Sequence, residues 1–351
     1  MGEEVYLRLR EFLDKLPAGY PATPTGVEIR ILKKMFTPEQ AELAMKLREE
    51  PEGVESIAAR TGRDETELGE MLEEMARKGC IFRVRDGEKR RYQAFQFIVG
   101  LYEFQLNNID REYAEMLEQY IPYLGLSMLP LKTKQLRVIP LESSIEAGSA
   151  VATYNRVRKL VEEQEIISVQ QCICRKEQGL LGHPCDRPQE SCLCFGDFAR
   201  FYIDNGLGRR ISVEEALGVL DLAEESALVL CPTNSQKIEA ICCCCPCCCP
   251  NLKGAKLMPR PADFVHSYYQ AKIDSDLCSA CALCMDRCQM DAIRELDDRW
   301  EVVDGRCIGC GLCVSECPTS AISMVAKPGM EAPPRDFSET IHRIGAERGL
   351  P

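Results

Sequence analysis

The sequence predicts an α+β protein with three folded parts, and two observations lead to this prediction. The cysteines are unevenly distributed: of 22 in 351 residues, Cys80 stands alone and all the others lie between residues 172 and 317. The first hundred residues instead show helical and strand periodicities with no unusual composition. This length is sufficient for two or three domains.

The expected boundaries follow these changes in pattern. They are an N-terminal domain with an arm at 1–98, a helical connector at 99–148, a cysteine-rich α/β domain at 149–271, a small domain with a repeated cysteine motif at 272–326, and a C-terminal tail at 327–351.

The N-terminal domain has the element order of a winged helix-turn-helix. Thr37 and Pro38 provide an N-cap and a first helical residue for one of its helices, and Gly62 marks the turn between two others. The expected elements are helices at 29–35, 38–47, 54–60 and 64–78, and a hairpin wing at 81–85 and 90–97.

The helix at 64–78 would enter the major groove if this domain bound DNA. Residues 63–78 carry six acidic side chains against three basic ones, the wrong balance for a recognition helix. The wing is basic, but the chain has a net charge of −12, and phosphate binding depends on Lys and Arg. We therefore do not expect nucleic acid as the main partner, and we expect the domain to bind protein.

Residues 98–125 have an apolar stripe at helical spacing, which predicts a helix. The stripe could serve as core or as a dimer contact, so a homo-oligomer is one alternative. Its members are Ile109, Tyr113, Met116, Leu117 and Tyr120. The elements expected after it are a strand at 136–139, a helix at 149–163, a strand at 166–169, and helices at 198–205 and 212–226.

The small C-terminal domain contains one cysteine motif twice. It reads C-S-A-C-A-L-C-M-D-R-C from Cys278 and C-I-G-C-G-L-C-V-S-E-C-P from Cys307. The C-x2-C-x2-C spacing wraps three thiolates around a 4Fe-4S cubane, and in the two-cluster pattern the last cysteine of each run binds the other cluster. The expected ligands are Cys278, Cys281, Cys284 and Cys317 for one 4Fe-4S cluster, and Cys307, Cys310, Cys313 and Cys288 for the second.

On these residues, the stretch 272–326 resembles a bacterial-type dicluster ferredoxin. The resemblance implies a ferredoxin-like fold whose two halves are related by a local twofold axis. One departure is Gln289, which stands where the family usually has the proline that Pro318 supplies in the other run. A pair of zinc sites is the less favoured alternative, because zinc motifs usually separate two C-x2-C pairs by a long spacer.

The central domain has a second set of candidate ligands, which is scattered. Apolar burial does not require so many neighbouring sulfurs, and adjacent cysteines have poor geometry for mutual disulfides. We therefore expect one or two further iron-sulfur clusters, with a noncubane or fused cluster among the alternatives. The expected ligands are first Cys172, Cys174, Cys185 and Cys192, and then members of the run Cys242, Cys244, Cys245, Cys247, Cys248 and Cys249.

Motifs along the whole chain resemble a family of iron-sulfur proteins from anaerobes that carry a 4Fe-4S dicluster domain. These motifs are F-T-P-E-Q-A-E-L-A, G-L-Y-E-F-Q, C-I-C-R, C-D-R-P-Q-E-S-C and I-C-C-C-C-P-C-C-C. The resemblance implies electron transfer without naming a substrate. The family usually has Asn at the position of Cys243, which implies that this thiol is not a ligand.

These patterns predict a low-potential electron-transfer protein that exchanges electrons with a redox partner protein and passes them between its ferredoxin clusters and the central centre. Glycine motifs for nucleotides and a nucleophile elbow are both absent. The alternatives are a catalytic oxidoreductase subunit with its substrate at the cysteine-rich centre, and a redox-sensing regulator. Thiolate ligation, the lack of a leader pattern and the lack of a membrane-spanning apolar run predict a cytoplasmic protein, and we expect it to be part of an oxidoreductase complex.

Overall fold

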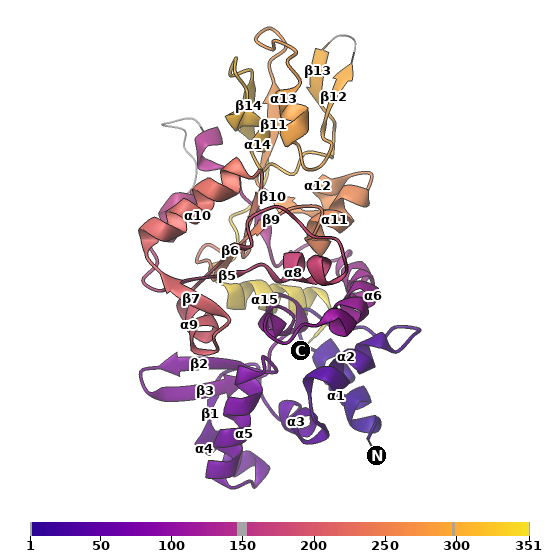
Figure 1. The fold of residues 1–351 in the computed structure, drawn as a ribbon, viewed down its shortest axis with the longest axis vertical. Coiled ribbons are helices and arrows are strands. Elements are labelled where there is room, and N and C mark those ends of the chain that lie inside the picture. The colour runs from indigo at the N-terminus through magenta and orange to yellow at the C-terminus, as the bar shows by residue number, and fades with distance from the viewer. Residues whose placement is uncertain (1, 146–152, 297–298, 351) are drawn as a thin grey trace.

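The computed structural model describes residues 2–145, 153–296 and 299–350. The chain is a mixed α+β structure with several small sheets. Its three parts follow one another along the longest axis: the N-terminal helices at one end, the central sheet in the middle, and the C-terminal domain at the other end (Figure 1).

The N-terminal part consists of five helices and a small sheet of order β1-β3-β2. Its elements are α1 (Glu4–Asp14), α2 (Val27–Met35), α3 (Pro38–Ala44), β1 (Glu52–Gly53), α4 (Val54–Thr61), α5 (Glu65–Arg77), β2 (Phe82–Asp86) and β3 (Lys89–Gln93). The expected helices and hairpin are all present, but α3 ends at Ala44 where the helix was expected to reach 47, and β3 ends at Gln93 where the strand was expected to reach 97. The identity of this part as a winged-helix domain stays a prediction.

Local sequence explains where these helices begin and end. The Thr37 side chain and Gln40 form a capping box at the start of α3. At the start of α5, the Asp64 carboxylate accepts hydrogen bonds from the amides of Thr66 and Glu67, at 2.9 and 3.1 Å. Gly62 ends α4 with a left-handed φ of 68°.

The connector differs from the expected helix over 98–125. The long helix α6 (Arg111–Met128) begins after Asp110, whose carboxylate caps the Tyr113 amide at 2.8 Å. Before it lie two irregular turns, η1 (Phe97–Leu101) and η2 (Glu103–Gln105). The Glu103 carboxylate accepts a hydrogen bond from the Gly100 amide at 2.7 Å and so stabilises the non-helical backbone there.

The apolar stripe of α6 is buried within the chain itself. Ile109, Tyr113, Met116, Leu117 and Tyr120 are each at most 6% exposed and belong to one core cluster with α1 and α2. The stripe is therefore core, and it is not available as a dimer contact.

The central part is built on a five-stranded sheet of order β7-β5-β6-β9-β8. Every neighbouring pair in this sheet is antiparallel, so the sheet lacks the parallel strands of the expected α/β arrangement. The strands are β5 (Ile167–Gln171), β6 (Glu190–Phe195), β7 (Gly208–Ile211), β8 (Val229–Pro232) and β9 (Ala240–Cys244).

Helices and short segments surround this sheet. They are β4 (Arg137–Val138), η3 (Glu142–Ser144), η4 (Thr153–Asn155), α7 (Val157–Glu162), α8 (Ile173–Leu180), α9 (Gly196–Asp204), α10 (Val213–Glu225), α11 (Pro250–Leu257), α12 (Pro261–Phe264) and β10 (His266–Ser267). The predicted helix at 149–163 corresponds to η4 and α7, and its first residues, 149–152, lie outside the described residues.

The two faces of the sheet join different cores. On one face, α9 packs against the hairpin of the N-terminal part, with Phe82 and Phe201 ring centroids 5.0 Å apart and Phe104 and Phe201 centroids 4.4 Å apart. On the other face, α7, α10 and α11 share a core with Ile308 and Leu312 of the C-terminal domain. The central sheet is thus packed against both end parts.

The C-terminal domain consists of paired strands and two short helices. They are β11 (Tyr269–Ile273), α13 (Leu283–Arg287), β12 (Ile293–Leu296), β13 (Arg299–Val302), α14 (Leu312–Ser315) and β14 (Ile322–Ala326). Strand β11 pairs with β14, and β12 pairs with β13, both antiparallel.

The segment expected as a C-terminal tail contains the helix α15 (Phe337–Glu347). This helix returns to the middle of the molecule (Figure 1). Phe337 lies 6.2 Å from Phe198 of α9 between ring centroids, and the Arg348 guanidinium donates to the Leu16 carbonyl at 2.6 Å.

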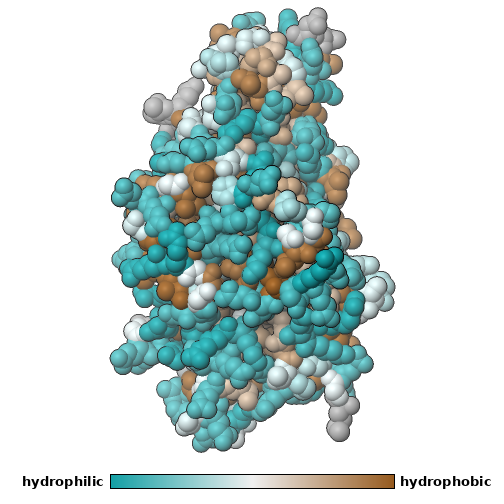
Figure 2. All heavy atoms as spheres, in the orientation of Figure 1, coloured by the Kyte–Doolittle hydropathy of each residue, from teal (hydrophilic) through white to brown (hydrophobic). Residues whose placement is uncertain are grey.

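Figure 2 shows a surface that is mostly hydrophilic, with hydrophobic side chains gathered in patches across the middle and at the end of the C-terminal domain. None of the helices in the described part of the chain combines the length and hydropathy that a membrane span requires.

Candidate metal centres

The C-terminal domain brings its eight cysteines together in two sets. One cavity is lined by Cys278, Cys281, Cys284 and Cys317, and a second by Cys288, Cys307, Cys310 and Cys313. Each set has three cysteines from one run and the last cysteine of the other, the combination expected from the sequence. We call them the outer set and the inner set, respectively.

The two cysteine loops have the same backbone conformation. Left-handed residues occur at Ala280 and Ala282 in the first loop, with φ of 55° and 65°, and at Gly309 and Gly311 in the second, with φ of 73° and 77°. The last cysteine of each run accepts a hydrogen bond from the amide four residues later, Ala292 to Cys288 and Ala321 to Cys317, each at 3.2 Å. Such amide-to-sulfur hydrogen bonds help set the potential of a bound cluster.

The two sets differ in their surroundings. The outer set belongs to the domain at the far end of the molecule (Figure 1), and its Cys281 is exposed. The inner set lies against the central part: the Cys310 carbonyl accepts a hydrogen bond from the Leu141 amide at 3.1 Å. Neighbouring Ile308 and Leu312 are buried in the central core.

A second group of thiols lies in the central sheet, at positions that the strand pairing places opposite one another. Cys192 of β6 is opposite Cys242 of β9, which in turn is opposite Cys231 of β8. Because opposed residues point to the same face, their side chains converge there. Cys172 precedes α8 and contacts both Cys174 and Cys192, and Cys244 contacts Cys231, Cys242 and Cys249. We call this set the cysteine row: Cys172, Cys174, Cys192, Cys231, Cys242, Cys244 and Cys249.

Hydrogen bonds within the row favour thiolates at alternate positions. Those from Cys174 and Cys192 lower the pKa of Cys172 well below its ordinary value, and those from Cys192 and Cys244 do the same for the pKa of Cys242. Metal and cluster ligands bind as thiolates, so the row offers anionic sulfur in a buried place.

Buried polar groups surround the row. The Arg175 side chain, 2% exposed, donates to the carbonyls of Pro188 and Cys243, each at 2.8 Å, and its charge helps lower the pKa of Cys172. The Tyr102 hydroxyl lies 3.7 Å from the Cys174 sulfur and donates to the Glu177 carboxylate at 2.6 Å. Burial raises the pKa of Glu177 to about 7.

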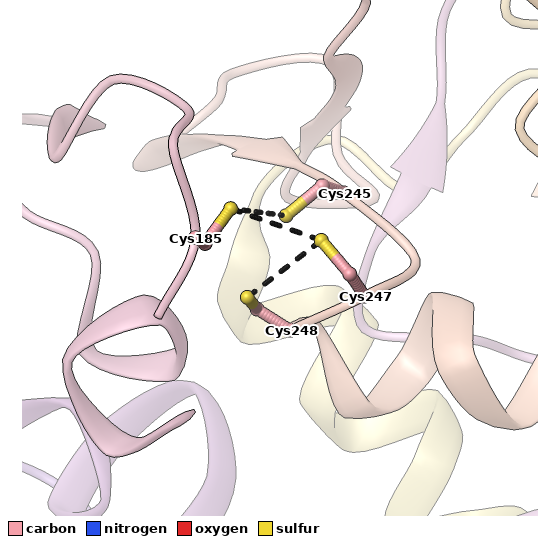
Figure 3. A group of neighbouring side chains, drawn as sticks. All are labelled: Cys185, Cys245, Cys247 and Cys248. Atoms are coloured by element: carbon pink, nitrogen blue, oxygen red, sulfur yellow. Dashed lines mark hydrogen bonds between the residues drawn. The ribbon is translucent and has the colours of Figure 1, made fainter. Parts of the chain in front are cut away.

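A third group is separate from the row. The sulfur atoms of Cys185, Cys245, Cys247 and Cys248 all lie within 4.8 Å of one another. Cys185 belongs to the loop between α8 and β6, and the other three belong to the turn between β9 and α11 (Figure 3). We call these residues the four-cysteine group.

The structure therefore places the candidate ligands of the central part in two separate groups, the row and the four-cysteine group. Of the four expected first, it places Cys172, Cys174 and Cys192 in the row and Cys185 in the four-cysteine group. Of the run, Cys242, Cys244 and Cys249 join the row, and Cys245, Cys247 and Cys248 join Cys185.

One member of the row, Cys231, and one thiol beside the row, Cys194, were not among the expected ligands. Cys231 joins through strand register, and Cys194 lies two residues beyond Cys192 on the same strand, so both share its face. The C-x-C pattern in a strand was the available signal for Cys194. Cys243 points instead into the aliphatic core opposite Leu230, and burial raises its pKa.

Comparison with known proteins identifies the C-terminal part. Residues 271–324 match the family model of the 4Fe-4S dicluster domain, so this part of the chain is a 4Fe-4S dicluster domain. Such a domain holds two 4Fe-4S clusters, and the two cysteine sets described above are the residues that fit them. No curated protein and no solved structure matched the chain.

Proposed function

We propose that this protein transfers electrons between a redox partner protein, which docks at the outer set, and an iron-sulfur centre held by the cysteine row. The observation that carries the proposal is the order of the sulfur sites along the molecule. The outer set is at the exposed end, and the inner set adjoins the core that contains Cys231, Cys244 and Cys249 of the row.

The outer end has features that suit docking. Leu277, Leu283 and Met285 flank the outer cysteines and are 54%, 44% and 42% exposed. Exposed apolar side chains that are grouped in this way commonly mark interaction sites. The chain's net charge of −12 favours a partner with a basic surface, which would be steered toward it.

The chemistry of the row suits a cluster of several irons. Seven thiols extend through the protein, and among the described residues they do not form a compact group of the kind that encloses one ion. Arg175 and the Tyr102–Glu177 pair supply positive charge and hydrogen bonds, which adjust the potential of such a centre.

The alternative of a DNA-binding regulator has less support, because basic side chains of the wing have partners within the chain. Arg83 is 3% exposed and pairs with Glu73 at 2.6 Å, Arg85 pairs with Asp204 at 2.9 Å, and Arg90 pairs with Glu73 at 3.2 Å. The hairpin is thereby committed to contacts with α5 and α9.

The test is rapid mixing of the full-length protein, prepared without oxygen, with a reduced low-potential protein donor, followed by freeze-quench EPR. We expect the dicluster signals to appear first and a third signal to grow as they decline. In a Leu283→Ser, Met285→Ser variant, the first step should slow severalfold while the second keeps its rate. A protein with only the two dicluster signals, or with equal rates in the variant, would contradict the proposal.

A further inference from the structure

The four-cysteine group has dimensions that differ from those of the other thiol sites. Its sulfur atoms are 4.0 Å apart between Cys185 and Cys245, 3.8 Å between Cys185 and Cys247, and 3.8 Å between Cys247 and Cys248. In Figure 3 the four sulfurs face a common centre, one from the left-hand loop and three from the opposite turn.

These three distances are close to the edges of a tetrahedron around one ion, and all six sulfur–sulfur distances are within 4.8 Å. A metal with four thiolates at about 2.3 Å has sulfur–sulfur edges of about 3.8 Å. A 4Fe-4S cubane places four irons between its thiolates, so its ligand sulfurs must stand farther apart. We propose that Cys185, Cys245, Cys247 and Cys248 bind a single tetrahedral metal ion, Zn²⁺ or mononuclear iron, the metals that this donor set selects.

The dicluster domain provides an internal comparison. Among the described residues, its eight cysteines form no group that could hold a single metal ion, as expected for thiols that would enclose two cubanes. The four-cysteine group is such a group. The same chain therefore spaces its thiols differently for the two kinds of centre.

The turn that carries three of the ligands has the geometry of a closed loop. The Cys249 amide donates to the Cys245 carbonyl at 2.9 Å, and Pro250 then starts α11. Pro246 separates Cys245 from Cys247 and Cys248 in the sequence, and the sulfurs on both sides turn inward (Figure 3). The positive charge of the buried Arg175 guanidinium acts on Cys245 and so offsets part of the negative charge of four thiolates.

The expected role of the ion is to fasten the loop that contains Cys185. Between α8 and β6 this loop has no regular secondary structure, and Cys185 is 60 residues away from Cys245 in the sequence. A metal that joins them closes this long segment, which restricts the unfolded chain much as a cross-link does. The inference is independent of the proposed electron transfer.

The test compares metal and sulfide in three full-length proteins prepared without oxygen: wild type, a Cys185→Ala, Cys247→Ala variant, and a Cys243→Ala control. Cys247 is exposed and Cys185 half-buried, so their truncation leaves the core intact. We expect the double variant to lose one zinc, or one iron, per chain with no loss of acid-labile sulfide. The Cys243→Ala protein should keep both at the wild-type level.

Loss of several irons together with equivalent sulfide in the double variant would overturn the proposal, and so would unchanged metal content. Spectroscopy of the wild type gives a decision that does not depend on the variant's folding. X-ray absorption at the zinc edge should show four sulfurs at about 2.3 Å, or, for iron, Mössbauer spectra should show an isolated site beside the cubanes. The absence of both would also overturn it.

Discussion

Four residues with left-handed backbone show how the two cysteine loops reach the same shape with different sequences. The first loop uses Ala280 and Ala282, and the second uses Gly309 and Gly311. Alanine in this conformation costs about 1–2 kcal/mol relative to glycine. Glycine is favoured at position 311 for a second reason, because a Cβ there would collide with the Ser144 side chain and the Leu141 amide of the central part.

Gly311→Ala should therefore weaken the inner cluster, whereas Ala282→Gly at the equivalent outer position should not. Gly311→Ala adds backbone strain and a steric clash with residues 141–144. Ala282→Gly relieves about 1 kcal/mol of backbone strain. The measurement is the decay of visible cluster absorbance at raised temperature. Gly311→Ala should bleach several times faster than wild type, and Ala282→Gly at the same rate or slower; equal rates for Gly311→Ala and wild type would contradict this.

Individual cysteines differ in how far sequence reveals their partners. The eight dicluster cysteines could be assigned in advance because each C-x2-C-x2-C loop is continuous in sequence and the motif occurs twice. The row could not, because its members meet through the register of three strands, which residue spacing does not specify. Cys185 lies only seven residues before Cys192, yet the loop carries it to a different site.

At the scale of elements, the hairpin of the N-terminal part is joined to α9 of the central part. Arg83 is the centre of this junction: it pairs with Glu73 and donates to Asn205 at 3.0 Å. Removing one partner of a buried ion pair typically costs about 3–5 kcal/mol, because the other charge is left without compensation.

Arg83→Ala should accordingly lower the thermal unfolding midpoint by several degrees. Arg91→Ala on the neighbouring strand is the matched control, because Arg91 is exposed and such surface changes stay within about 0.5 kcal/mol. Calorimetry of the two variants beside wild type makes the comparison. Similar midpoints for Arg83→Ala and Arg91→Ala would mean that the junction contributes little.

Helix α15 depends on a carboxyl group whose ionisation is disfavoured. Glu239 accepts hydrogen bonds from Thr233 at 3.0 Å, Ser235 at 3.2 Å and the Phe337 amide at 3.4 Å. Burial raises the pKa of Glu239 to about 7 from its ordinary value of 4.5. The folded chain therefore keeps a proton that the unfolded chain releases.

Because the pKa of Glu239 is higher in the folded chain than in the unfolded chain, its contribution to stability should be complete below about pH 4.5 and decline as pH rises to about 7. Glu239→Gln keeps the shape and removes the ionisation, so its stability should vary less with pH. Limited proteolysis at the α15 junction between about pH 5 and pH 8 gives the measurement. Parallel pH profiles for wild type and variant would show that another group is responsible.

The elements themselves were largely predictable where local signals are strong. The N-cap Thr37 located α3, Gly62 marked the turn before α5, and Ser212, at the start of the predicted helix 212–226, located α10, where its hydroxyl accepts from the Glu215 amide at 3.1 Å. The connector was mispredicted because apolar periodicity continues through 97–110 while the Gly100–Glu103 hydrogen bond bends the chain. The return of α15 could not be foreseen, because its contacts are with residues far away in sequence.

At the scale of the whole molecule, iron content separates the dicluster domain from the iron-sulfur centre proposed for the cysteine row. The dicluster domain accounts for about eight irons per chain, and we expect more in the full-length protein. Cys242→Ser should remove only iron above that number, because Cys242 is central in the row. Cys310→Ala should remove or convert one dicluster cubane and leave the row's iron, as EPR and iron analysis will show. Loss of all iron in either variant would mean that the sites do not assemble separately.

The attachment of the dicluster domain limits how it can work. It departs from the body at β11 and returns at β14, and these strands pair from Tyr269 to Ile273. Beyond β14, the backbone amides of Gln236 and Lys237 donate hydrogen bonds to the carbonyls of Pro334 and Arg335, at 2.7 and 2.9 Å. Helix α15 then packs against the central part. A domain secured at both ends does not move as a swinging arm. Under the proposed function, a redox partner must therefore diffuse to a fixed docking site, and the observed rate of electron transfer should rise with partner concentration.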